Sequence, residues 1–320
     1  MRSAAPAVAR SIEFDPYIPL FSNGDANTVV GRYWPVGLEA GEERVFATEP
    51  GVRVTGRCHW RSRGAAVAVL VHGLEGSCEA NYVRSMARAL LVAGFNVLRM
   101  NVRTCGGTEH LAPTLYHSGL TSDLRAIVEE LRDHSLFLIG FSMGGNQALK
   151  LAGEWGERAP AHVRGVCAIS APIDLASCAR RLTEPRNRIY ELRFLSGLRA
   201  RLQRKARLQP ERFSLQPLAR VRSIIDFDHY VTAPAFGFRD AWDYYEQSSA
   251  LPGLAAVRIP SLLIQARDDP FIPFECFRLP ANPALRLLDP PHGGHVSFLS
   301  RGRPRFWAAQ QAVRFAQAYG

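Results

Sequence analysis

The stretch that decides the fold is Leu138-Ile139-Gly140-Phe141-Ser142-Met143-Gly144-Gly145. It places a serine between two glycines, at the point where an apolar run typical of a buried strand gives way to residues that favour a helix. A sharp strand-to-helix turn of this kind, the nucleophile elbow, lifts a serine hydroxyl above the edge of a sheet. Side chains two positions before and after the serine would collide with neighbouring elements, and Gly140 and Gly144 avoid that collision. The pattern predicts that Ser142 is a nucleophile.

The G-x-S-x-G pattern is weak by itself, because chance supplies it in roughly one chain of this length in ten. Its surroundings strengthen it. The run 136–139 suits a buried parallel strand, and residues 147–152 are rich in good helix formers. A glycine-rich turn with an incidental serine is the alternative interpretation. All three parts of an elbow are present, which favours the elbow.

Composition sets the class of protein. The 320 residues, 47% of them hydrophobic, are enough for one large α/β domain with an insertion or for two ordinary domains. The six cysteines are scattered without a C-x-x-C pair, which argues against a disulfide framework or a zinc site and fits a reducing cytosol. The run 4–9 is too short and too rich in alanine for a signal-peptide core, and no apolar run is long enough to span a bilayer. We therefore expect a soluble, cytoplasmic protein.

The net charge of +10 is concentrated in one segment. Between residues 179 and 222, thirteen Arg or Lys stand against three acidic residues, so this segment alone carries the excess and the rest of the chain is neutral overall. Within the segment, one predicted helix face carries Leu195, Leu198, Leu202 and Leu208, and the rest of that helix carries Arg199, Arg201, Arg204, Lys205 and Arg207. A solvated helix face is one interpretation, and docking to anionic lipid is the functional alternative. We expect no nucleic-acid partner, because no recognised nucleic-acid fold is present and aromatic residues do not alternate with the arginines.

Strand and helix patterns alternate along most of the chain. Two short alternating patterns between residues 44 and 60 predict an antiparallel hairpin. The strands expected next are 65–71, 95–100, 136–139, 163–170, 261–265 and 285–288, and the helices that flank the elbow helix are 82–92, 120–131 and 304–319. The alternation stops between about 174 and 253. We therefore predict an α/β fold, a mostly parallel, doubly wound sheet with a helical cap inserted over the carboxyl ends of its strands.

The predicted organisation is a single domain over residues 1–320. Residues 1–60 form an N-terminal lead-in and hairpin, residues 61–173 and 254–320 form the catalytic core, and residues 174–253 form the cap insertion. Caps in this position control access to the ligand site.

A base for Ser142 is the next requirement, because a serine hydroxyl is a poor nucleophile at neutral pH. An elbow serine is expected to precede first its acid and then its histidine in the chain. Of nine histidines, only His292 and His295 follow the last predicted strand. His295 is favoured because the two preceding glycines let the loop place an imidazole over the elbow, and His292 is the alternative.

The acid is sought in the segment that follows the buried strand 261–265. Asp268 and Asp269 both lie there. Asp269 is favoured because it precedes a Pro-apolar-apolar-Pro turn that would hold its carboxylate, while Asp268 and Asp174 remain alternatives. The pair could suggest a metal site, but no third carboxylate or histidine lies near it in sequence, so no metal is expected.

Two backbone N–H groups are needed to stabilise the oxyanion that forms when serine attacks a carbonyl. Met143 supplies one, as the residue after the nucleophile, and the segment 71–76 at the end of the first parallel strand should supply the other. We expect the Leu74 N–H. His72 is expected to hold this loop through hydrogen bonds rather than to act as the base, and a simple glycine turn is the alternative interpretation of the segment.

With these residues the chain resembles the α/β-hydrolase superfamily and, within it, the AB hydrolase 4 family of YheT-type predicted esterases. The resemblance covers nearly the whole chain. It rests on residues 72–77 with Tyr82, 101–103, 116–119 with Asp123, 140–146, 268–270 and 293–296, and in the cap on Phe227-Asp228, Thr232-Ala233-Pro234, Gly237-Phe238, Tyr244-Tyr245 and Ser248. Carried over residue by residue, the family's triad falls on Ser142, Asp269 and His295.

The chain departs from the family pattern at two places. Thr104 follows Arg103 where the family usually has a glycine, and Ser297 stands where a glycine is expected beside the histidine. The first departure puts the shape of that loop in question, and the second is expected to change packing more than chemistry.

The resemblance implies hydrolysis of carboxylic esters, with medium-chain or lipid-derived acyl groups, and no cofactor. The predicted activity is that of a serine esterase that forms an acyl-enzyme on Ser142 and takes a small-molecule acyl ester as its substrate. Peripheral contact with an anionic membrane through the basic cap is a further expectation. The alternatives are an acyltransferase that uses the same triad and a non-catalytic α/β-hydrolase binding module.

Overall fold

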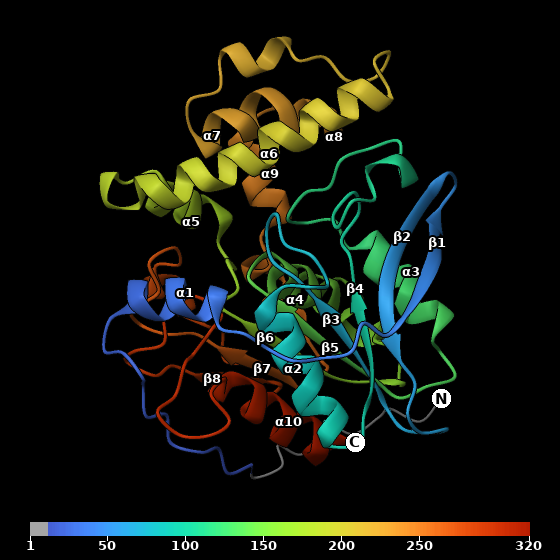
Figure 1. Cartoon of the computed structure of the whole chain (residues 1–320), viewed down its shortest axis with the longest axis vertical. Helices are drawn as coiled ribbons and strands as arrows, with labels where there is room; N and C mark the ends of the chain where they lie inside the picture. Colours follow the sequence, from blue (N-terminus) through green and yellow to red (C-terminus); the bar gives the residue numbers. More distant parts are fainter. Residues whose placement is uncertain (1–11) are drawn as a thin grey trace.

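A computed structural model of the chain describes residues 12–320 (Figure 1). One eight-stranded sheet runs in the order β1-β2-β4-β3-β5-β6-β7-β8. The strands are β1 (Glu42–Glu49), β2 (Val52–His59), β3 (Val67–Val71), β4 (Asn96–Met100), β5 (Leu136–Phe141), β6 (Val163–Ile169), β7 (Ser261–Ile264) and β8 (Leu285–Leu288). β1 and β2 pair antiparallel, β2 pairs antiparallel with β4, and β3 to β8 are parallel. The predicted hairpin and mostly parallel sheet are confirmed.

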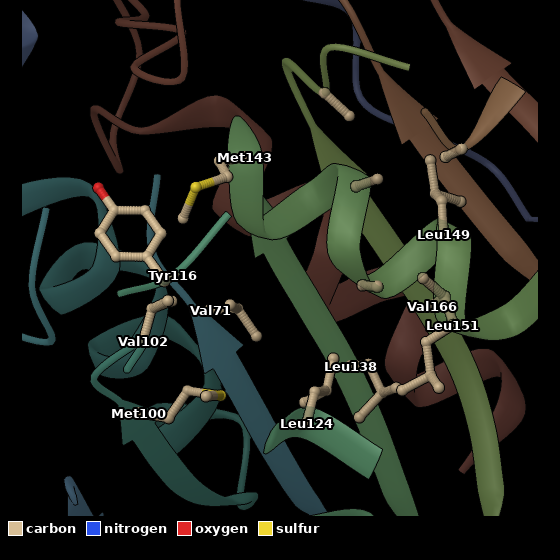
Figure 2. Close-up of a cluster of buried hydrophobic side chains, with 14 of the residues drawn as sticks. Val71, Met100, Val102, Tyr116, Leu124, Leu138, Met143, Leu149, Leu151 and Val166 are labelled. Atoms are coloured by element: carbon tan, nitrogen blue, oxygen red, sulfur yellow. The ribbon is translucent and has the colours of Figure 1, made fainter. Parts of the chain in front are cut away.

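Both faces of the sheet are buried, and the central strands are apolar at successive positions for that reason. In β3, Val67, Val69 and Val71 belong to one hydrophobic cluster, while Ala68 and Leu70 belong to the other. The first cluster includes side chains of α3 (Ser122–Glu130) and α4 (Met143–Trp155), and the second includes side chains of α2 (Asn81–Val92) and α10 (Trp307–Tyr319). Figure 2 shows part of the first cluster, where Leu124 of α3 and Leu149 and Leu151 of α4 lie over β3, β5 and β6.

A layer of helices covers one end of the sheet (Figure 1). It consists of α5 (Leu175–Leu182), α6 (Arg188–Leu208), α7 (Ile224–Phe227), the π-helical turn η5 (Asp228–Thr232), α8 (Ala233–Phe236) and α9 (Ala241–Ser248). All of them lie within the predicted insertion 174–253. Residues that follow β5, β6 and β7 line one cavity together with α5, α6 and α9, so the cap covers the carboxyl ends of the strands.

Helix α6 differs from the predicted amphipathic pattern. Leu195, Leu198 and Leu202 are buried, but Leu208 is 52% exposed, while Arg201 and Lys205 are buried at 5% and 0%. These two cations face the core because they have partners there. The Lys205 ammonium donates to the carbonyl oxygens of Ala112 (2.5 Å) and Glu109 (3.2 Å), and Arg201 pairs with carboxylates. The predicted division of this helix into an apolar face and a solvated basic face is therefore wrong at Arg201 and Lys205.

The N-terminal lead-in contains a helix that the sequence patterns do not predict, α1 (Gly24–Tyr33). The Asn23 side chain caps it by accepting a hydrogen bond from the Ala26 N–H at 2.9 Å. α1 packs tightly on the loops that follow β7 and β8. A Cβ on Gly24 would lie 2.0 Å from the Asp268 carbonyl oxygen, and one on Gly31 would lie 2.2 Å from the Ser297 Cβ.

Candidate active site

Ser142 occupies the turn between β5 and α4 with φ 51° and ψ −122°, a conformation that costs free energy for a residue with a side chain. Close packing holds it there. A Cβ on Gly140 would lie 2.2 Å from the Gly144 carbonyl oxygen, and a Cβ on Gly144 would lie 2.4 Å from the Val71 carbonyl oxygen. The Ser142 N–H donates to the Ile169 carbonyl oxygen of β6 at 2.8 Å. The two glycines therefore allow the elbow to sit directly against β3.

The His295 imidazole pairs with the Asp269 carboxylate, with Nδ1 and Oδ2 separated by 2.9 Å. Asp269 is 5% exposed, and its other oxygen accepts hydrogen bonds from the N–H groups of Phe271 (2.9 Å) and Ile272 (3.2 Å). The Pro-apolar-apolar-Pro turn thus supplies donors that hold the carboxylate. Because Nδ1–H donates to Asp269, Nε2 of His295 is left as the proton acceptor.

The alternative acids and the alternative histidine are hydrogen-bonded elsewhere. Asp268 accepts from the Gly294 N–H at 2.9 Å and lies 3.2 Å from Nδ1 of His292. Asp174 caps α5, where its carboxylate accepts from the N–H and the hydroxyl of Ser177. Asp268 therefore holds the loop that carries His292 and Gly294, and Asp174 is the N-cap of α5.

One cavity beneath the cap brings together Ser142, Met143, Leu74 and His295. Asp269 lies behind His295 and is not part of the lining. Figure 2 shows Met143 at the start of α4 with the Tyr116 ring beside it. Tyr116 also lines the cavity, together with cap residues of α5, α6, α7, η5 and α9.

The predicted oxyanion donors belong to two tightly turned segments. Within residues 12–320, neither the Leu74 N–H nor the Met143 N–H donates to a protein acceptor. The Leu74 loop is held by the Gly76 N–H, which donates to the Gly73 carbonyl oxygen at 3.0 Å, and by the Tyr82 hydroxyl, which accepts from the Gly73 N–H at 3.0 Å. The arrangement leaves two backbone donors free at the wall of the cavity, as an oxyanion site requires.

His72 is fully used by the structure of this loop. Its Nδ1–H donates to the Gly73 carbonyl oxygen at 2.7 Å, and Nε2 accepts from the Val102 N–H at 3.0 Å. Burial lowers the pKa of His72 to about 4, so the imidazole is neutral at pH 7. Neither nitrogen is left to exchange a proton with a substrate.

An ion pair that sequence reasoning missed joins the cap to the Leu74 loop. Glu75 has φ 52°, and its carboxylate accepts from Arg201 of α6 at 2.8 and 3.2 Å and from the Tyr116 hydroxyl at 2.6 Å. Arg201 also donates to the Thr104 carbonyl oxygen. Thr104 itself has φ 61°, a conformation that suits the glycine of the family pattern. The cap thus contacts the backbone or side chain of two residues in left-handed conformations, Glu75 and Thr104, beside the Leu74 N–H.

Helix α1 supplies a second missed contact. The Thr28 hydroxyl accepts a hydrogen bond from the His295 N–H at 2.8 Å and donates to the Gly24 carbonyl oxygen at 2.7 Å. The Tyr190 hydroxyl of α6 donates to Asp25 at 2.8 Å, which ties α1 to the cap. The only local signal in the sequence is the Asn23 cap, and nothing in it indicates a contact with residue 295.

Residues 12–320 provide neither a cluster of metal ligands nor a membrane-spanning helix. Within the described range, 12–320, no group of three or more His, Cys, Asp or Glu side chains is placed to hold a metal ion. No helix in that part of the chain combines the length and the apolar character needed to cross a bilayer.

We predict that Arg201→Met lowers kcat for a short-chain ester at least about tenfold while KM changes little. The loop that carries the Leu74 N–H, the expected oxyanion donor, loses one of its supports, and a misplaced donor of this kind acts mainly on the transition state. Arg201→Lys should recover part of the loss. Arg207→Met, an exposed position on the same helix, is the matched control and should match wild type in steady-state kinetics. A wild-type kcat in Arg201→Met would show that the ion pair does not position the loop.

Comparisons with known proteins place the fold in a family. A family model described as alpha/beta hydrolase fold matches residues 67–301. The chain is 33% identical to a putative esterase, YheT, of Escherichia coli, over 78% of this chain and 76% of that protein. It is 28% identical to a monoacylglycerol lipase of Saccharomyces cerevisiae, over 78% of this chain and 59% of the lipase.

Two further matches are a second yeast relative and a solved structure. A second yeast relative, named medium-chain fatty acid ethyl ester synthase/esterase 2, is 25% identical over 78% of this chain and 61% of its own length. Among solved structures, an esterase of Pyrococcus furiosus superposes with a TM-score of 0.58 at 20% identity, over 89% of this chain and 98% of that one, which shows a shared fold. The chain therefore belongs to the α/β-hydrolase family, in the branch that contains the YheT esterase.

Proposed function

We propose that this esterase-type α/β-hydrolase is a serine hydrolase that cleaves carboxylic esters through an acyl-enzyme on Ser142. The observation that carries the proposal is one cavity lined by both the strained Ser142 and His295, with His295 paired to Asp269 at 2.9 Å. The relatives named esterase and monoacylglycerol lipase support an ester as the substrate.

In the proposed reaction a proton moves from Ser142 to His295 and then to the leaving group. Ser142 Oγ attacks the ester carbonyl carbon while Nε2 of His295 accepts the hydroxyl proton, and Asp269 stabilises the imidazolium that forms. The negative oxygen of the tetrahedral intermediate accepts hydrogen bonds from the N–H groups of Leu74 and Met143. His295 then returns the proton to the leaving alcohol, and in the second half it activates a water that releases the acid.

The walls of the cavity favour an acyl chain. Side chains from the cap and from the loop after β7 give it a broad apolar surface, formed by Leu175, Leu182, Phe194, Leu198, Ile224 and Phe271. Burial of each methylene group on such a surface stabilises binding by about 0.8 kcal/mol. We propose medium-chain or lipid-derived acyl groups, in keeping with the names of the lipase relatives.

Acyl transfer is the second candidate, because one relative is named both synthase and esterase. It uses the same three residues and differs only in whether water or an alcohol attacks the acyl-enzyme. A purely binding module is disfavoured by the cost of the strained serine, which has no evident structural benefit.

Cytoplasmic location also stays a prediction, consistent with six cysteines that are all free thiols.

A series of p-nitrophenyl esters with acyl chains of increasing length tests the proposed activity. We expect kcat/KM to rise from acetyl to medium chains and then to level off, because longer chains bury more methylene groups against the apolar wall. Ser142→Ala should abolish turnover of every member of the series. Turnover by Ser142→Ala at the wild-type rate would contradict the assignment of the nucleophile.

We also propose peripheral contact with an anionic membrane, through a surface that we call the α1–α6 surface. It combines exposed apolar side chains of α1 and α6 with arginines, and consists of Val29, Tyr33, Ile189, Leu192, Arg32 and Arg193. The bond between Tyr190 and Asp25 joins the two helices there. Arg201 and Lys205 are buried and do not contribute, which moves the expected contact toward the N-terminal end of α6.

Co-sedimentation with vesicles of neutral and of anionic lipid tests this contact. We expect binding to anionic vesicles that weakens with salt, and about tenfold weaker binding for Ile189→Ser, because an inserted isoleucine contributes apolar burial. Leu215→Ser, at an exposed leucine of the cap outside the α1–α6 surface, is the control. Binding that ignores both lipid charge and salt would contradict the proposal.

A further inference from the structure

Asp228 is a carboxylate in the wall of the Ser142 cavity that the proposed reaction does not use. It is the first residue of the π-helical turn η5, a rare geometry that is often found at functional sites. With Thr232 and Tyr245 it belongs to the cap residues on which the family resemblance rests, and none of these three takes part in the proposed reaction. The position of this acid in a mostly apolar cavity therefore needs a physical explanation.

The partners of the Asp228 carboxylate are two neutral hydroxyls. Oδ1 accepts from the Thr232 hydroxyl at 2.8 Å, and Oδ2 accepts from the Tyr245 hydroxyl at 2.7 Å. Within residues 12–320 no basic side chain forms an ion pair with it. Each carboxylate oxygen can accept a second hydrogen bond, so the group has unused acceptor capacity.

Burial raises the pKa of Asp228 to about 6, and the hydrogen bonds from Tyr245 and Thr232 oppose that rise. The carboxylate is therefore the main form at pH 7 and above. A carboxylate whose only donors are two neutral hydroxyls is stabilised by a further donor that enters the cavity. The two hydroxyls also fix the orientation of the carboxylate, so a ligand meets it already in place.

The cavity has two walls of different chemistry. The apolar wall consists of side chains of α5 and α6 and of Phe271. The centroid of the Phe271 ring lies 4.6 Å from the centroid of the His295 ring. The polar wall is formed by the segment after Leu115 and by η5 and α9, where the Ser118 N–H donates to the Tyr244 hydroxyl at 3.0 Å. Asp228 lies in the polar wall. A substrate that is apolar at one end and rich in hydroxyls at the other matches both walls.

We propose that Asp228 binds the alcohol part of the substrate, and that the preferred substrates are acyl esters whose alcohol carries free hydroxyl groups, such as glycerol monoesters. The inference rests on the proposed function and names the substrate class of the same cavity. A substrate hydroxyl donates to the Asp228 carboxylate while the acyl chain lies along the apolar wall. Asp228 acts in binding and specificity and takes no proton in the reaction.

The test compares two esters of one acyl chain, monooctanoylglycerol and methyl octanoate, on the whole protein. The measured quantity is the ratio of their kcat/KM values, which does not depend on how much of a variant is correctly folded. We expect the wild-type ratio to favour the glycerol ester and Asp228→Asn to lower that ratio about tenfold, since a hydrogen bond to a charged acceptor is lost. Asp243→Asn is the control, because Asp243 of α9 pairs with Arg239 and does not line the cavity, and it should keep the wild-type ratio.

A second variant and a third substrate complete the test. Tyr245→Phe keeps the carboxylate and frees one of its oxygens, so the preference for the glycerol ester should persist. Octanoylcholine carries a positive charge and no hydroxyl donor. An unchanged ratio in Asp228→Asn, or a loss confined to the choline ester, would overturn the proposal, whereas absence of turnover of every ester by wild type would instead overturn the proposed function.

Discussion

The close approach of the β5–α4 turn to the end of β3 is the constraint on which the candidate site depends. The backbone of Gly144 comes so near to the Val71 carbonyl oxygen that a Cβ there would lie 2.4 Å away. That contact places the start of α4 against the loop that carries Leu74, and it holds Ser142 at φ 51°. Strain at one residue persists only when its surroundings over-determine it, and here the parallel sheet supplies those surroundings.

Segments distant in sequence then complete the site around this turn. Arg201 of the cap fixes Glu75 next to Leu74, and Thr28 of α1 accepts a hydrogen bond from the backbone of His295. The cap and α1 are in turn joined through Tyr190 and Asp25. The loops that carry Leu74 and His295 therefore depend on α6 and α1, so a shift of the cap would alter both loops together.

Local patterns in the sequence were sufficient for the sheet and the elbow. Apolar runs such as Val67–Val71 reveal buried parallel strands, and the spacing of Gly140 and Gly144 reveals the turn, because both depend on residues close in the chain. Asp269 could be favoured over Asp268 from the prolines that follow it, and the structure places its carboxylate beside His295.

The contacts that tie the site together left no such signal. Arg201 and Glu75 are 126 positions apart, and Thr28 and His295 are 267 apart, so neither local periodicity nor a motif links them. The buried state of Lys205 was missed for the same reason. Its partners are backbone carbonyl oxygens of Glu109 and Ala112, and backbone acceptors carry no residue identity that a sequence pattern could use.

We propose that the strained Ser142 is an activated nucleophile. Reaction of the wild-type protein with a fluorophosphonate, followed by mass spectrometry of its peptides, tests it most directly. We expect a single adduct on Ser142, formed much more slowly in Asp269→Asn, whose neutral side chain stabilises the His295 imidazolium poorly. Labelling at another residue, or no labelling of a folded protein, would contradict it.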